Sequence, residues 1–134
     1  MKEITPLLEQ YNGLVNVIMN TDYSAQEYAD TEQELVSTLK QLSGKLEQEH
    51  LEKITEVSKV LNSEAVMVPI AEAVSSIKSD ESFEYVLNQF LDCFEDGRHE
   101  SVTATACYQA MLKIDSERVQ REGIDQHPFL VQLD

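Results

Sequence analysis

The residues of this sequence best suited to chemistry lie in CFEDGRHESVTATAC, residues 93–107, which holds two cysteines, a histidine and an arginine. A cysteine nucleophile needs a base within hydrogen-bond reach. His99 precedes Cys107 by about 12 Å along a helix, at 1.5 Å per residue. A catalytic pair is therefore not expected, and Cys107 is interpreted as a small core residue.

The same stretch also offers soft metal ligands. Cys93, His99 and Cys107, together with the distant His127, are ligand types that zinc accepts. Their spacing, C-x5-H-x7-C, matches no short ligand motif. A metal site at Cys93, His99 and Cys107 is therefore kept only as the weaker alternative.

An ordinary corner between two helices explains the stretch better. Asp96-Gly97 is typical of a turn after a helix end, and Ser101 can cap the helix that follows. Arg98 can offset the carboxylates around it. Both cysteines are then packing residues with free thiols, as a reducing compartment favours, and no cofactor is expected.

The charge of the chain is its most unusual property. Its 25 acidic and ten basic residues give a net charge of −15, beyond the roughly 2–8 of a small domain. Such a surface repels phosphate backbones and anionic lipid head groups, so direct binding to nucleic acid or membranes is not expected. The N-terminal residues lack the apolar core of a signal peptide, which predicts a cytoplasmic location.

Two lines of carboxylates flank apolar stripes, one over residues 27–34 and one over residues 81–95. Like charges at helical spacing destabilise a helix by about 0.2–0.5 kcal/mol per pair, so both lines carry a local cost. They form either a solvated face or a docking surface for a basic protein. The candidate partner-binding residues are Glu27, Asp30, Glu34, Glu81, Glu84, Asp92 and Glu95.

These carboxylates favour a non-enzymatic interaction protein that binds a basic protein partner, because no common nucleotide-binding or hydrolase motif is present. In size and charge the chain resembles bacteriocin immunity proteins, and this resemblance implies an inhibitor or immunity-type role without assigning any residue. The alternative is a small helical ligand- or metal-binding protein with a site between the fifth and sixth helices. An enzyme is the third hypothesis.

Apolar residues recur at helical spacing through the whole chain, and glycines and prolines are few. The pattern predicts one domain, 1–134, folded as an all-α bundle of five or six helices with an extended, docked C-terminal tail. The clearest apolar stripe contains Phe83, Phe90 and Phe94. The expected helices cover residues 6–19, 25–43, 46–61, 69–78, 80–95 and 101–121.

Local signals set the expected helix starts. Thr5-Pro6 is a cap followed by proline at the first helical position. Ser24 and Glu27 form the pattern of a capping box for the second helix, and Gly44 is placed to end that helix.

Two residues that disfavour helices are interpreted differently. Gly13, inside the first helix, is expected to mark a close approach between helices. The ring of Pro69 would clash inside a helix that starts at Ser63. We therefore expect an irregular connection over residues 62–68 and a helix that starts at Pro69.

Overall fold

Six α-helices and four short 3-10 turns make up the computed structural model, which describes residues 4–22, 24–59, 63–97, 100–128 and 130. No described residue forms a strand, which confirms the all-α class. The helices are α1 (Ile4–Met19), α2 (Gln26–Leu42), α3 (Leu51–Thr55), α4 (Glu64–Val74), α5 (Asp80–Asp92) and α6 (Ser101–Arg121). The 3-10 turns are η1 (Gln48–His50), η2 (Glu56–Lys59), η3 (Glu95–Gly97) and η4 (Ile124–Gln126).

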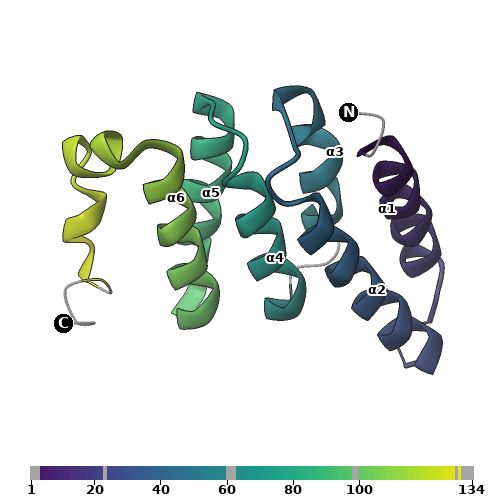
Figure 1. The fold of residues 1–134 in the computed structure, drawn as a ribbon. Coiled ribbons are helices and arrows are strands. Elements are labelled where there is room, and N and C mark those ends of the chain that lie inside the picture. Colours follow the sequence, from purple (N-terminus) through teal and green to yellow (C-terminus); the bar gives the residue numbers. More distant parts are fainter. Residues whose placement is uncertain (1–3, 23, 60–62, 98–99, 129, 131–134) are drawn as a thin grey trace.

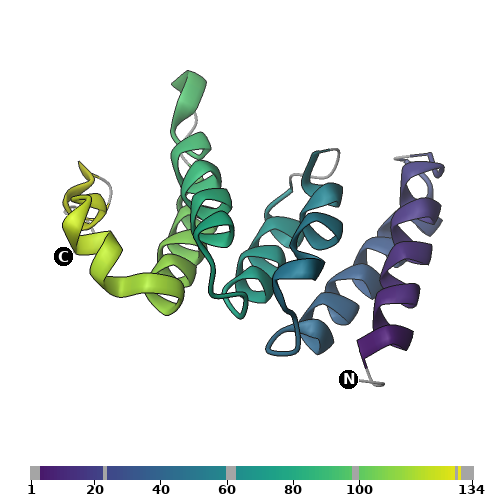
Figure 2. The same ribbon diagram turned by 90° about the horizontal axis from the view of Figure 1, so that it is seen from above.

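The helices follow one another in pairs along an elongated row (Figure 1). Helices α2, α4 and α6 pack side by side, while α1 packs on α2, α3 on α4 and α5 on α6. Helix α1 and the turn η4 lie at opposite ends of the row in both views (Figures 1 and 2). Helix α6 contacts α4, α5 and the turn η4.

The first pair is tied to the middle of the row through Tyr11. This side chain of α1 is fully buried, and its hydroxyl donates to the carbonyl oxygen of Ile54 in α3 at 2.7 Å. Burial raises the pKa of Tyr11, because the charged phenolate would lose its hydration. Tyr11 therefore joins α1 to α3.

The expected caps at three helix starts are wrong. Helix α1 already begins at Ile4, so Thr5 lies inside it. Helix α2 begins at Gln26 without a side-chain cap, because the hydroxyl of Ser24 donates instead to Asp22 Oδ1 at 2.9 Å. Helix α6 begins at Ser101 itself, after the uncapped Glu100.

The expected irregular connection before Pro69 is also wrong for residues 64–68, since α4 runs from Glu64 to Val74 with Pro69 inside it. Pro69, Val66 and Ile70 are all buried. Proline lacks only one N–H, and packing of an apolar helix against α2 and α6 outweighs that local cost. Residue 62 lies outside the described residues.

Gly13 does not mark a close approach, because a Cβ placed there would meet nothing within 4 Å. The expected helix over 46–61 is broken in its described part into η1, α3 and η2. By contrast, Gly44 follows the C-terminal end of α2, as expected. Its φ of 89° lies in the left-handed conformation that favours glycine.

The described part of the C-terminal tail packs against the end of α5, whereas the sequence predicted docking without indicating its place. The ring of His127 lies 5.0 Å from that of Phe90 and 4.8 Å from that of Phe94, and Leu130 is buried. The segment is not extended at this point, because the amide of Leu130 donates to the carbonyl oxygen of His127 at 2.9 Å. Residues 131–134 lie outside the described residues.

Candidate functional site

The acidic line on α2 is exposed along one flank of the helix. Glu27, Asp30 and Glu34 are all exposed, whereas Leu35 faces the core. The amide of Gln26 donates to Asp30 Oδ1 at 3.1 Å. Within the described ranges, no lysine or arginine pairs with these three carboxylates. The negative charge of these three carboxylates is therefore not neutralised by an ion pair within the described part of the chain.

The acidic line near α5 is only partly helical. Glu81, Glu84 and Asp92 are exposed on α5, which ends at Asp92. Glu95 follows in the turn η3, so it does not continue the helical line as the range 80–95 predicted. The four carboxylates thus divide between a helix and the turn after it.

Arg118 of α6 neutralises part of the α5 line. Its guanidinium nitrogens lie 3.7 Å from Asp80 Oδ1 and 3.7 Å from Glu84 Oε2. Its Nε donates to Glu122 Oε2 at 2.6 Å, and this bond raises the pKa of the guanidinium. The same group stacks over the ring of Phe83 at 4.3 Å, a favourable cation–π geometry.

A bend in α6 places Arg118 there. Asp115 has a non-helical backbone conformation inside α6, with φ −162° and ψ 86°. Its carboxylate accepts the backbone N–H of Arg118 at 3.1 Å, as an N-cap does for the third residue of a helix. Asp115 therefore starts a second helical segment whose first turn carries Arg118 toward α5.

The structure does not bring the two acidic lines together. Helix α2 packs on α1 and α4, whereas α5 packs chiefly on α6. Helix α4 thus stands between α2 and the α5–α6 pair (Figure 1). The seven expected partner-binding residues therefore belong to two separate surfaces.

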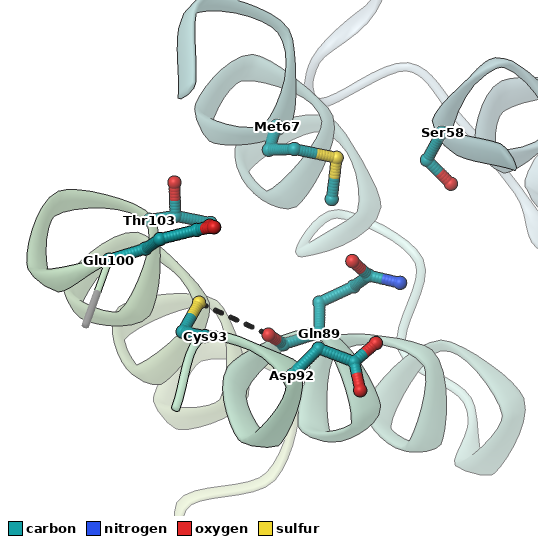
Figure 3. A pocket seen from close by; sticks show the side chains of 7 residues that line it. All are labelled: Ser58, Met67, Gln89, Asp92, Cys93, Glu100 and Thr103. Atoms are coloured by element: carbon teal, nitrogen blue, oxygen red, sulfur yellow. Dashed lines mark hydrogen bonds between the residues drawn. The ribbon is translucent and has the colours of Figure 1, made fainter. Parts of the chain in front are cut away.

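A cavity of about 190 Å³ opens between η2, α4, α5 and the start of α6. Ser58, Met67, Gln89, Cys93 and Thr103 form its walls (Figure 3). The N–H of Glu100, which also lines the cavity, donates to the carbonyl oxygen of Cys93 at 3.1 Å. This bond brings the start of α6 beside the end of α5.

One wall of this cavity is fixed by the partly buried hydroxyls of Ser58 and Tyr85. The hydroxyl of Tyr85 donates to Ser58 Oγ at 2.9 Å, and that of Ser58 donates to the carbonyl oxygen of Thr55 at 2.6 Å. Burial raises the pKa of Tyr85 to about 12. Tyr85 is therefore a neutral donor at neutral pH, and it ties α5 to η2.

Both cysteines are buried and neither forms a disulfide bond, as expected. Cys107 is 1% exposed, and burial raises its pKa to about 12, since the thiolate would be desolvated. Its assignment to the core is confirmed. In the weaker alternative of a metal site, His99 lies outside the described residues, and the described part of the chain contains no group of three potential His, Cys, Asp or Glu ligands.

Sequence reasoning missed the Arg118 cluster, and it missed the part that η2 and α4 play in the cavity. Part of the cluster was detectable, because Arg118 and Glu122 stand four residues apart, as do Asp80 and Glu84. Contact between the two pairs depends on the bend at Asp115, which no sequence pattern marks. The contribution of Ser58 and Met67 to the cavity depends on packing between distant elements and had no signal in the sequence.

Comparison with known proteins adds no further assignment. The chain matches no family model, no curated protein is similar to it, and no solved structure resembles it. Among the described residues, no helix combines the length and apolar character that a membrane span requires. The interpretation of function therefore depends on the geometry described above.

Proposed function

We propose that this protein is a non-enzymatic interaction protein that binds a basic protein partner through the acidic flank of α2, formed by Glu27, Asp30 and Glu34. One observation carries the proposal. In a chain of net charge −15, these three carboxylates are exposed and have no ion pair to a described basic residue. Their field is available to a partner.

The span of the α2 line sets the kind of partner surface it fits. From Glu27 to Glu34 the line covers about 10 Å, at 1.5 Å per helical residue. About three residues of extended chain, at roughly 3.3 Å each, cover the same length. Two or three lysine or arginine side chains on one basic segment can therefore meet the three carboxylates together.

The α5 line is the weaker docking surface, because Arg118 already pairs with Glu84. Glu81, Asp92 and Glu95 belong to the proposal as a flanking field that attracts the same basic partner from a distance. An inhibitor or immunity-type role is the most specific form of the proposal, since masking a basic surface requires no catalytic group.

The experiment begins with affinity purification of a partner from the native host. Association rates are then measured by stopped flow over a range of salt concentrations. We expect the rate to fall steeply with salt, because the screening length shortens from about 10 Å at 0.1 M to about 3 Å at 1 M. At low salt, the triple variant Glu27→Gln, Asp30→Asn and Glu34→Gln should associate about tenfold more slowly.

The matched control is the triple variant Glu81→Gln, Asp92→Asn and Glu95→Gln, which removes the same charge from the other surface. It should slow association less than the α2 variant does. A partner whose association ignores both salt and the α2 substitutions would contradict the proposal.

A second candidate function, binding of a small ligand, is favoured by the cavity between α4, α5 and α6. The alternative ligand site was expected between the fifth and sixth helices, and residues of α5 and α6 form part of the wall of this cavity. Its chemistry differs from that of the weaker metal alternative, because amide, hydroxyl and carboxylate groups dominate its walls.

A further inference from the structure

The cavity between η2, α4, α5 and α6 is lined by Thr103, a buried residue whose hydroxyl has no hydrogen-bond partner among the described residues. Thr103 is 4% exposed, and its side chain makes no hydrogen bond to another described residue. Every fully inaccessible side-chain nitrogen or oxygen of the described residues has a partner. The Thr103 hydroxyl is therefore accessible to a small molecule, and Thr103 is one of the residues that line this cavity.

A second polar group faces the same space. The side-chain amide of Gln89 reaches upward from α5 beneath Met67 (Figure 3), and it makes no hydrogen bond to a described residue. Its backbone carbonyl oxygen is engaged by the thiol of Cys93 at 3.2 Å. A half-buried amide and a buried hydroxyl lose free energy unless water or a ligand bonds them.

The charge of the cavity selects a cation. Asp92 from α5 and Glu100 before α6 both line it, inside a protein of net charge −15. No basic residue is among the described residues of its wall. An anionic ligand would meet repulsion from the carboxylate of Asp92, whereas an ammonium group would be attracted.

The donor set fits an organic cation better than a metal ion. Calcium takes six to eight oxygen ligands and zinc takes four, and the described residues contain no group of three potential His, Cys, Asp or Glu ligands. The thioether of Met67 adds a polarisable apolar surface, which suits the carbon atoms of a small molecule. The volume of about 190 Å³ lies below the roughly 300–1,000 Å³ of pockets for drug-sized ligands.

We propose that this cavity binds a small organic ammonium compound. The ammonium group lies at the carboxylate of Asp92, and the polar groups of the ligand bond the Thr103 hydroxyl and the Gln89 amide. Met67 covers the carbon chain. The site is separate from the acidic flank of α2, so either function can exist without the other.

The test is two-dimensional NMR titration of the ¹⁵N-labelled full-length protein. The cationic probes are ethanolamine and 1,4-diaminobutane, and the matched controls are propionamide, which is neutral, and propionate, which is anionic. We expect saturable amide shifts at Gln89, Cys93 and Thr103 with the two amines. The controls should give at least tenfold weaker binding, since they lack the attraction to Asp92.

Two variants locate the site. Asp92→Asn changes an exposed residue and should weaken amine binding about tenfold. Its control is Asp30→Asn on α2, which removes the same charge and should change binding less than twofold. Thr103→Val replaces the hydroxyl by a methyl group and should weaken ethanolamine binding, with Thr105→Val on the same helix as its control.

Circular dichroism and thermal melting verify the fold of each variant, and Asp92→Asn keeps the test valid if Thr103→Val fails to fold. Shifts spread over the acidic surface that respond equally to Asp30→Asn and Asp92→Asn would overturn the proposal, because they indicate diffuse counter-ion binding. Equal binding of propionamide would overturn the assignment to a cation.

Discussion

The two ends of the row carry the same kind of acidic helix but treat its charge differently. On α5, Arg118 lies 3.7 Å from both Asp80 and Glu84 and stacks on Phe83. On α2, no described arginine or lysine pairs with Glu27, Asp30 or Glu34. Two similar sequence patterns therefore have different roles. The acidic line on α5 helps to join α5 to α6 through Arg118, whereas the acidic line on α2 is exposed to solvent.

The cores beneath the two lines differ as well. The C-terminal pair is covered by a docked segment, in which His127 packs on Phe90 and Phe94. The N-terminal pair ends the row, and Val17 and Met19 on α1 remain 41% and 55% exposed. Large apolar side chains are also exposed at the C-terminal end, where Leu91 of α5 and Val102 and Leu112 of α6 are 43%, 51% and 38% exposed. The two ends therefore differ in the C-terminal segment that packs on Phe90 and Phe94, not in overall exposure of apolar side chains.

The largest effect is expected from Phe90→Ala, which tests this difference in packing. Phe90 is fully buried between Phe94 and His127, so truncation should lower the free energy of unfolding by about 3–5 kcal/mol. Chemical denaturation followed by circular dichroism measures the change. Leu91→Ala is the control, because Leu91 is 43% exposed and should cost much less. A neutral Phe90→Ala would show that the C-terminal core is loosely packed.

Much of the fold followed from the sequence because apolar spacing is a strong signal over long helices. Helix α6 runs over Ser101–Arg121, the range expected from the pattern, and the Phe83 and Phe90 stripe of α5 is buried. The prediction for Pro69 was wrong because it considered only the cost of proline inside a helix. The burial of Val66 and Ile70 in α4 stabilises the helix by more than that cost. Local propensity is a weak guide where a segment is strongly apolar.

The sites were less predictable, because they depend on contacts between elements. The exposure of Glu27, Asp30 and Glu34 agrees with their place beside the apolar stripe. The pairing of Glu84 with Arg118 joins residues 34 positions apart and requires the bend at Asp115. Helical spacing predicts neighbours within one helix but says nothing about which helices meet.

A smaller effect is expected from Arg118→Met, which removes the feature that distinguishes the two acidic lines. Exposed ion pairs contribute about 0.2–1 kcal/mol each, and an exposed cation–π contact about 0.5–1 kcal/mol. We expect a loss of about 1–2 kcal/mol in 0.05 M salt and a smaller loss in 1 M salt. Arg121→Met is the control, because Arg121 is exposed and has no ion pair to a described residue. Equal effects of the two substitutions would contradict the role given to Arg118.

The smallest effect, and the most direct comparison of the two lines, comes from Glu34→Gln and Glu84→Gln. Both changes remove one exposed carboxylate at equal side-chain size. Glu84→Gln breaks the pair with Arg118 and should lower the free energy of unfolding by about 0.2–1 kcal/mol. Glu34→Gln relieves repulsion from Asp30 and should leave stability unchanged or raise it by about 0.2–0.5 kcal/mol.

At low salt, the two substitutions should therefore change the free energy of unfolding in opposite directions. This result would distinguish a carboxylate that stabilises the fold from one that destabilises it. In 1 M salt, where the screening length is about 3 Å, the difference should nearly disappear. Parallel urea titrations of the two variants measure both effects. If Glu34→Gln destabilises the protein as much as Glu84→Gln does, then the α2 line supports the fold and the argument that it is kept for a partner loses its basis.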